Sequence, residues 1–241
     1  FETILELMND SKIDVSDLIT HNFRIADGDK GVALLDNKSS HLGILINYPN
    51  AGSKFSKNEK IQLINKNNIS SKLNIGFIGA GNYASRHLIP ALKKTNSTLN
   101  TIISSNGLNS YSCGTKFGFN YISNNVDDIF LNKKINCVFI ASRHDSHSGY
   151  VLNALKNNKN VFCEKPLCIN MRELEEIKKL KKDKDNISLM VGFNRRFSPL
   201  VEVISKLLEE INQPKNFLIT VNAGFIDPED WTQNITTGGG R

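Results

Sequence analysis

Short apolar runs alternate with amphipathic stretches from residue 73 onward. The apolar runs predict β-strands at 73–78, 98–104, 135–142, 160–164 and 188–193. The amphipathic stretches predict helices at 82–94, 126–131, 145–157, 171–182 and 199–211. Strands that alternate with helices form parallel sheets with right-handed crossovers. The pattern therefore predicts an α/β fold built on a doubly wound parallel sheet.

The two ends of the chain break this alternation. Residues 1–50 contain a helix end at 3–8, extended pieces at 13–15 and 18–21 and a strand at 41–48, too little to bury a core alone. Residues 51–72 are polar and predict a linker with one helical turn near 61–64. The apolar stretch 217–222 predicts the first strand of another domain. We therefore expect a front unit at 1–50, a linker at 51–72, the sheet domain at 73–194 and the truncated start of a second α/β domain at 195–241.

Two close glycines stand between the first strand and the first helix of the sheet domain. The segment reads Gly79-Ala80-Gly81-Asn82-Tyr83-Ala84, a G-x-G-x-x-A pattern. Gly79 permits a tight turn, Gly81 lets a phosphate approach the backbone, and Ala84 lets helix and strand pack closely. The N–H groups at the start of the helix favour negative charge. We therefore predict a Rossmann dinucleotide site that includes Gly79, Gly81, Asn82, Tyr83 and Ala84. Pro90 predicts a bend or an early end of the helix that follows.

Composition and charge exclude several classes of function. The 241 residues are 39% hydrophobic and 22% charged, with a net charge of +6, which is typical of an ordinary globular protein. No apolar run approaches the roughly 20 residues of a membrane helix, and no secretory signal opens the chain, so we expect no membrane partner. The densest basic run, 178–184, ends a predicted helix, where lysines suit the helix dipole. Because no recognised motif accompanies it, we expect no nucleic-acid partner.

The cysteines and the chain ends add two expectations. Cys113, Cys137, Cys163 and Cys168 form no C-x-x-C pair and no Cys/His cluster with zinc spacing, so we expect no metal site. Reduced thiols fit an intracellular, cytoplasmic location. The chain begins with Phe1 and ends with three glycines and Arg241, which predicts a piece of a longer polypeptide.

Doubly wound sheets bind ligands at the carboxyl ends of their strands. Glu164, Lys165 and Pro166 stand at one such end. A lysine beside an apolar crevice is partly desolvated and can handle the proton that accompanies hydride transfer at a carbinol. Pro166 fixes the backbone beside it. From position alone, an ordinary surface lysine before a turn is an equally good interpretation.

Further polar residues follow the neighbouring strands. Ser142 ends the strand at 135–142, and Arg143, His144 and His147 follow it; either histidine can orient a sugar hydroxyl or a nicotinamide. Loop histidines are more often structural, and Asp145 fits a helix cap. Arg195 and Arg196 follow the last strand and can bind phosphate or carboxylate, although surface salt bridges are the simpler interpretation for one of them.

Ser104 and Ser105 stand where NAD sites usually carry an acidic residue that holds the ribose hydroxyls. Without a carboxylate, a 2′-phosphate meets no repulsion, so we expect NAD(P) with a slight preference for NADP. Lys116 is the nearest candidate for a phosphate partner. Equally, the serines can simply cap the next helix.

Three motifs together resemble one family. Ile78-Gly79-Ala80-Gly81-Asn82, Glu164-Lys165-Pro166-Leu167 and the segment 192–199 are similar to those of the Gfo/Idh/MocA oxidoreductases, and the resemblance covers residues 73–241. The resemblance implies that Lys165 contacts both the nicotinamide and the substrate. It also places His147 at the family's histidine after the fourth strand. The glycines at 238–240 resemble the start of the family's segment leading to a catalytic histidine, which would lie beyond Arg241.

The beginning of the chain resembles a different protein family. Residues 12–21 resemble the C-terminal tail of a zinc-dependent medium-chain alcohol dehydrogenase, whereas Asn22, Arg24 and Ile25 depart from that pattern. The metal ligands of that family lie upstream of such a tail, so the resemblance implies no zinc here. The order of the two pieces resembles bacterial two-domain oxidoreductases.

Together these observations predict an oxidoreductase that transfers hydride to or from a secondary alcohol of a sugar, a cyclitol or a sugar derivative. Lys165 and His147 are the predicted catalytic residues, and the 241-residue piece is expected to be nearly inactive alone. Two alternatives stay open: a dinucleotide-sensing module without turnover, and another Rossmann reductase of the imine or pyrrole type. Self-association into a homo-oligomer is also left open.

Overall fold

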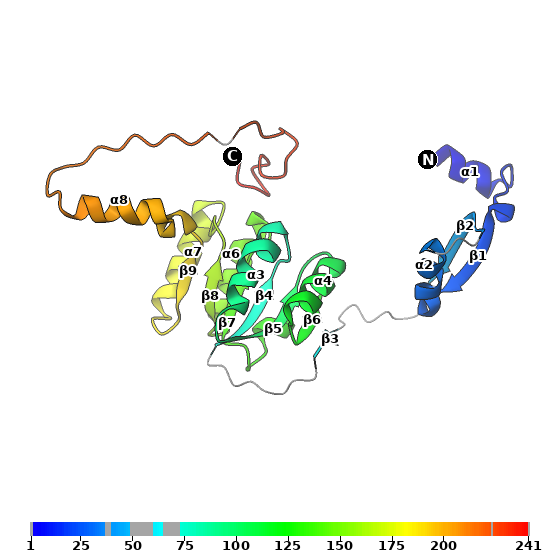
Figure 1. The fold of residues 1–241 in the computed structure, drawn as a ribbon, viewed down its shortest axis with the longest axis horizontal. Helices are drawn as coiled ribbons and strands as arrows, with labels where there is room; N and C mark the ends of the chain where they lie inside the picture. Colours follow the sequence, from blue (N-terminus) through cyan, green and yellow to red (C-terminus); the bar gives the residue numbers. More distant parts are fainter. Residues whose placement is uncertain (1, 37–39, 49–59, 65–72, 223, 241) are drawn as a thin grey trace. The chain divides into compact units, whose positions relative to one another are not determined.

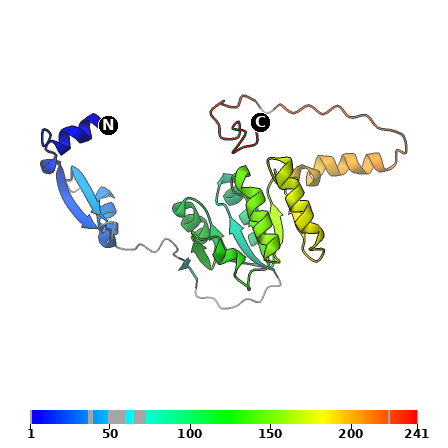
Figure 2. The same cartoon turned by 180° about the vertical axis from the view of Figure 1, so that it is seen from behind.

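The chain divides into two units, residues 1–56 and residues 57–241, and each is described by itself. The structure is a computed structural model that describes residues 2–36, 40–48, 60–64, 73–222 and 224–240. Figure 1 and Figure 2 show both units from opposite sides. No helix within these ranges is long and apolar enough to cross a membrane.

Unit 1 is a small strand–helix–strand arrangement. It contains α1 (Glu2–Asn9), the short turns η1 (Ser16–Leu18) and η2 (Ile25–Asp27), β1 (Ile19–Arg24), α2 (Gly28–Asp36) and β2 (Gly43–Asn47). β1 and β2 are parallel neighbours, as a connection through α2 requires. The sequence did not predict α2. None of the described hydrophobic side chains in this unit is fully buried.

Unit 2 is built on a seven-stranded sheet in the order β3-β6-β5-β4-β7-β8-β9. Six strands are parallel, and β3 runs antiparallel to β6 at one edge. The strands are β3 (Lys60–Gln62), β4 (Leu73–Ile78), β5 (Ser97–Ile103), β6 (Tyr121–Ser123), β7 (Cys137–Ile140), β8 (Asn160–Cys163) and β9 (Leu189–Val191). The five predicted strands are confirmed as β4, β5, β7, β8 and β9. The helical turn predicted near 61–64 is wrong, because Ile61 and Gln62 belong to β3, which pairs with β6, and residues 63 and 64 are in no helix.

Helices cover both faces of this sheet (Figure 1). They are α3 (Ile89–Lys93), α4 (Gly107–Phe117), α5 (Asp127–Phe130), α6 (His144–Lys156), α7 (Met171–Lys182) and α8 (Pro199–Glu209), with η4 (Asn194–Phe197) before α8. One core joins the sheet to α3 and α4 around Phe77 and Ile102, and another joins it to α5, α6 and α7 around Val138 and Leu155. Burial on both faces explains why these strands are continuous apolar runs.

Pro90 does not break its helix. Residues Ala84–Leu88 form a π-type turn, η3, and Pro90 lies in the first turn of α3. The backbone N–H of Ile89 bonds back to Ala84. A wider turn before the proline avoids the clash and the missing N–H bond that a regular α-helix would have at this position.

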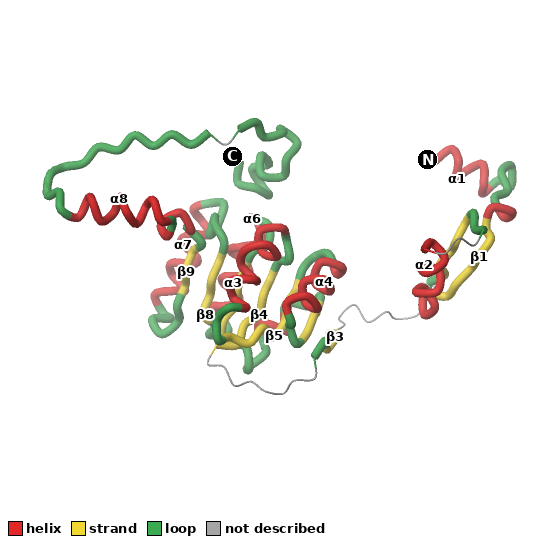
Figure 3. Tube along the Cα trace, viewed as in Figure 1, coloured by secondary structure: helices red, strands yellow, loops and turns green. Residues whose placement is uncertain are grey.

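The chain after α8 departs from the sequence prediction. Residues 217–222 form no strand, and outside residues 223 and 241 no helix or strand follows Glu209 (Figure 3). The apolar side chains Leu200 and Leu207 of α8 are exposed. A strand needs a hydrogen-bonded neighbour, and the described residues supply none here. The predicted start of a second α/β domain therefore consists of one helix and an irregular segment.

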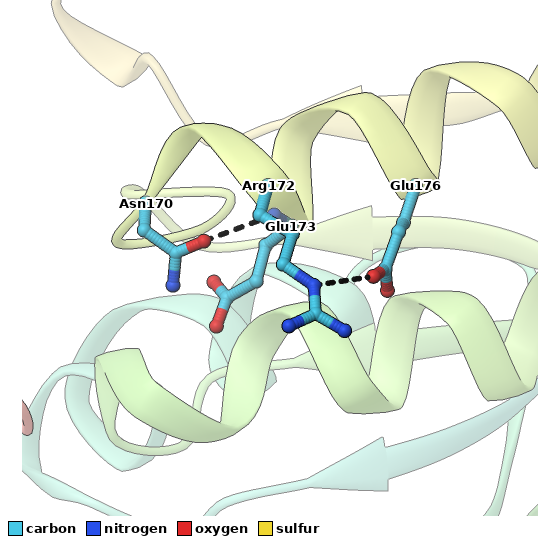
Figure 4. A network of polar contacts seen from close by, with 4 residues as sticks. All are labelled: Asn170, Arg172, Glu173 and Glu176. Carbon is cyan, nitrogen blue, oxygen red and sulfur yellow. Dashed lines mark hydrogen bonds and ion pairs between the residues drawn. The ribbon is translucent and has the colours of Figure 1, made fainter.

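A capping network fixes the start of α7 (Figure 4). The side chain of Asn170 accepts a hydrogen bond from the backbone N–H of Glu173 at 3.0 Å, and Glu173 accepts one from the backbone N–H of Ile169 at 3.1 Å. These contacts satisfy donors that the helix itself leaves free. Arg172 and Glu176 form an ion pair at 3.2 Å on the same helix.

We predict that Asn170→Ala lowers the free energy of unfolding by about 1 kcal/mol, because it removes a helix cap. The matched control is Arg172→Ala, whose side chain is 89% exposed, and its effect should stay within about 0.5 kcal/mol. Urea unfolding followed by circular dichroism measures both. Equal losses in the two variants would contradict the importance of the cap.

Candidate functional site: a cleft at the strand ends

A cleft of about 850 Å³ opens at the carboxyl ends of β4, β5, β7 and β8. This volume is within the range of small-molecule sites. The residues after each of these strands line it, which brings most of the sequence-predicted residues together. Those predicted residues are Gly79, Gly81, Asn82, Tyr83, Ala84, Ser104, Ser105, Ser142, Arg143, His144, His147, Glu164 and Lys165.

The glycine turn has the geometry that a phosphate-binding loop requires. Gly79 has a φ of 103°, and a Cβ there would lie 2.4 Å from the carbonyl oxygen of Ala141. Its backbone N–H donates to the carbonyl of Ile103 at 2.7 Å. A Cβ on Gly81 would meet no described atom within 4 Å, and Ala84 is buried in the core with α3 and α4. The turn is therefore fixed by β5 and β7 and open toward the cleft.

Glu164 and Lys165 stand together at the end of β8. Glu164 is 9% exposed, and its Oε1 accepts no hydrogen bond from any residue that the structure describes. Gly192 makes room for it, since a Cβ there would lie 2.8 Å from Oε1. Burial raises the pKa of Glu164, and the backbone N–H and the charge of Lys165 offset this only in part. Lys165 itself is exposed, so its side chain is solvated in this structure and not enclosed as the sequence suggested.

His147 lines the cleft but is only 1% exposed. Its Nδ1 lies 2.7 Å from the carbonyl oxygen of Pro166, and its Nε2 lies 3.0 Å from that of Ser142. The imidazole thus joins the loops after β7 and β8. Burial lowers the pKa of His147, and the two carbonyls, which favour the charged ring, oppose this in part. Because both nitrogens face the backbone, this geometry favours a positioning role over direct contact with a substrate.

The end of β5 carries hydroxyls and amides. The Ser104 hydroxyl donates to the carbonyl of Asn106 at 2.6 Å and also contacts Ser110. Asn106 caps α4 by accepting from the backbone N–H of Leu108. The cap is therefore Asn106 and not a serine. No acidic residue of the cleft lining follows β5, since Asp145 follows β7 and Glu164 follows β8. Lys116, the candidate phosphate partner, does not line the cleft.

Two predicted residues do not line the cleft. Pro166 contributes its carbonyl to His147 instead, and the exposed Arg195 lies in η4. Sequence reasoning left out Asn109, Tyr150, Asn194 and Trp231 as site residues. Asn194 donates to the Tyr83 hydroxyl at 2.8 Å, and its place directly after a predicted strand was a usable signal. Trp231 had no such signal.

The described residues show no group of three or more His, Cys, Asp or Glu side chains placed to hold a metal ion. A glycine turn at the end of β4 that opens into a cleft at the carboxyl ends of parallel strands defines a nucleotide-binding domain of the Rossmann type. A family model, "Oxidoreductase family, NAD-binding Rossmann fold" (GFO_IDH_MocA), matches residues 73–193. The chain belongs to this family.

Individual relatives agree with the family match. "Oxidoreductase P35" of Formosa agariphila is 33% identical over 142 residues, which cover 58% of this chain and 44% of that protein. Myo-inositol 2-dehydrogenase of Thermotoga maritima is 29% identical over 118 residues, covering 48% of this chain and 35% of that protein. The chain thus spans less than half the length of these relatives. The match begins at Leu73, and the alcohol dehydrogenase resemblance of residues 12–21 finds no support in it.

Solved structures share the fold of unit 2. Levoglucosan dehydrogenase, solved with NADH and levoglucosan, has a TM-score of 0.59 and 26% identity, over 69% of this chain and 49% of that chain. KijD10, a 3-ketoreductase from Actinomadura kijaniata solved with NADP and TDP-benzene, has a TM-score of 0.57 at 20% identity, over 70% of this chain and 52% of that chain. The second likeness concerns the fold alone.

We predict that the free energy of unfolding falls as the pH drops below 6.5 and that His147 carries part of this fall. The unfolded chain takes up a proton at His147 near pH 6.5, whereas the folded chain does so only at lower pH. In His147→Gln the fall should be smaller. At pH 8 this variant should be destabilised by roughly 1–3 kcal/mol, because the buried carbonyl that accepts the single N–H of the neutral ring loses its donor.

The control is the same substitution at an exposed histidine, His87→Gln, whose side chain lies outside the buried core. Glu164, with its raised pKa, acts in the opposite sense at lower pH and is present in all three proteins. Urea unfolding at a series of pH values makes the comparison. An unchanged pH dependence in His147→Gln would contradict the buried neutral ring.

Proposed function

We propose that this chain supplies the coenzyme-binding half of an NAD(P)-dependent dehydrogenase that acts on a secondary alcohol of a sugar or cyclitol. The observation that carries the proposal is the shared cleft: the glycine turn after β4 and the Glu164–Lys165 pair after β8 line one cavity. Inositol and levoglucosan dehydrogenases among the related proteins support the substrate class.

Each site residue has a part in this proposal. The turn from Gly79 to Ala84 would hold the coenzyme pyrophosphate, because it is open to the cleft and begins a helix. The nicotinamide coenzyme supplies the hydride chemistry when it is bound. The exposed ammonium of Lys165 can donate a proton to the carbonyl oxygen of a substrate in the reductive direction. The ring of His147 contacts the backbone carbonyls of Ser142 and Pro166 and so holds the loops after β7 and β8 beside Lys165.

The cofactor preference follows from the end of β5. Ser105, Asn106 and Asn109 line the cleft there without a carboxylate. The 2′-phosphate of NADP would meet hydrogen-bond donors there and no negatively charged side chain. We therefore propose that NADPH is bound at least as well as NADH.

Unit 1 and the cysteines each support one further proposal, the first on the origin of unit 1 and the second on where the protein is located. We infer that unit 1 is an alcohol-dehydrogenase-like unit separate from the oxidoreductase domain, on the resemblance of residues 12–21 alone. Cys113, Cys137, Cys163 and Cys168 are free, and burial raises the pKa of Cys137 to about 11. Three of these thiols are buried and Cys168 is partly buried, and burial raises the pKa of all four. Because protonated thiols suit reducing conditions, we propose a cytoplasmic location.

We predict that Lys165→Met keeps coenzyme affinity within about twofold, because the coenzyme is held mainly at the glycine turn. Turnover in any form of the protein that oxidises a substrate should fall about a hundredfold to ten-thousandfold, the usual contribution of a positioned proton donor. Calorimetric titration with NADH and NADPH measures the first effect, and oxidation of a panel of sugars and cyclitols measures the second.

The matched control for this prediction is Lys178→Met, an exposed lysine on α7 that is paired with Glu175. It should change neither quantity. If Lys165→Met turned over substrate as fast as the wild type, Lys165 would have no part in the reaction. The dinucleotide-sensing alternative would then gain support.

We predict that Ser105→Asp lowers NADPH affinity about tenfold or more, because a carboxylate at the end of β5 repels the 2′-phosphate. Ser105→Asn, a neutral side chain of nearly the same size, should have little effect. Calorimetry on the wild type and both variants provides the test. A strong wild-type preference for NADH would contradict the proposed cofactor preference.

A further inference from the structure

The last described segment of the chain folds back onto the cleft. Residues 227–240, here called the C-terminal strap, consist of consecutive turns (Figure 3). The strap contacts the start of α6 at two points. The backbone N–H of Asp145 donates to the carbonyl of Thr237 at 3.1 Å, and Nδ1 of His144 lies 2.8 Å from the carbonyl oxygen of Gly238.

Gly238 allows this return. A Cβ at Gly238 would lie 2.4 Å from both Cα and the carbonyl oxygen of Thr232, so only glycine fits against that backbone. The N–H of Gly238 also donates to the carbonyl of Asn234 at 2.7 Å. The strap therefore has a defined conformation, and its loop presents the side chain of Trp231 to the cleft.

Trp231 contacts the residues that follow β7. Its ring meets the His144 ring edge-on at a centroid distance of 4.7 Å, and the guanidinium carbon of Arg143 lies 5.7 Å from its centroid. Trp231 is only partly buried, so its ring keeps surface available to a ligand in the cleft.

The position of Trp231 along the cleft follows from the strand order β5-β4-β7-β8. The His144 ring lies 5.8 Å from the ring of His147, which in turn contacts the carbonyl of Pro166. Trp231 therefore lies at the end of β7, one strand from Lys165 after β8 and two strands from Ser105 after β5. In a sheet of this type, the adenosine ribose lies at the end of the strand after the glycine turn. The nicotinamide half then faces Trp231.

We infer that Trp231 is a coenzyme-contacting residue whose indole ring packs against the nicotinamide half of a bound dinucleotide. This inference rests on the proposed function. A large, rigid indole is well suited to the flat nicotinamide ring, and the oxidised ring is also cationic, which adds attraction to the π face. The C-terminal strap thus completes the site from a part of the chain well beyond the family match.

The chain itself provides the reporter, because Trp231 is its only tryptophan. We propose to titrate the 241-residue protein with NAD⁺ and NADP⁺, and with ADP-ribose and its 2′-phosphate, which lack the nicotinamide. The oxidised coenzymes should quench the tryptophan emission strongly. The ribose compounds should bind, as calorimetry shows independently, yet change the emission little.

Affinity gives a second readout. Trp231→Ala should weaken NAD⁺ and NADP⁺ binding about tenfold, the scale of a lost aromatic contact with its buried area. Its affinity for the ribose compounds should be unchanged, which also shows that the variant is folded. Ile235→Ala is the control, since this side chain is in the same strap, is 77% exposed and does not line the cleft.

The outcomes separate this inference from the proposed function. If coenzymes and ribose compounds all bind but give the same emission change, Trp231 does not contact the nicotinamide. A loss of affinity that is equal for both classes of ligand in Trp231→Ala would make the residue merely structural. If nothing binds to the wild type, the coenzyme site itself is wrong and the inference fails with it.

Discussion

The contact between the backbone at Gly79 and the end of β7 is the constraint on which the cleft depends. A side chain at this position would overlap the carbonyl of Ala141, and the φ of 103° suits glycine. The chain after β4 can therefore turn away from the sheet without covering the end of β5 or the end of β7. The open surface beside Gly81 and the buried Ala84 follow from the same geometry.

Polar contacts hold the other side of the cleft in place. The ring of His147 joins the loops after β7 and β8 through two backbone carbonyls, while the cap at Asn170 fixes the start of α7 beyond them. Glu164 packs against Gly192, and its Oε1 has no hydrogen-bond partner among the described residues. Leaving one oxygen of a buried carboxyl group without a partner is costly, and the same burial raises the pKa of Glu164.

The sheet and the first part of the site were accessible from sequence because each depends on local rules. Strands covered on both faces are continuous apolar runs, and the glycine pattern between strand and helix has a direct steric meaning. The polar helix α4 and the three-residue strands β3 and β6 escaped prediction because neighbouring strands and packing hold them, not a periodic pattern. Residues 217–222 were wrongly predicted as a strand, since an apolar stretch forms one only beside a partner.

The amino-acid sequence determined that this chain belongs with the NAD-binding oxidoreductases, through Gly79, Gly81 and the Glu164–Lys165–Pro166 strand end. It also determined which residues stand at the carboxyl ends of the strands. Only the tertiary structure decided that both His147 nitrogens face the backbone and that Trp231 returns over the cleft. The physical reason is that both facts depend on contacts between segments far apart in the chain, and no local pattern records which segments will meet.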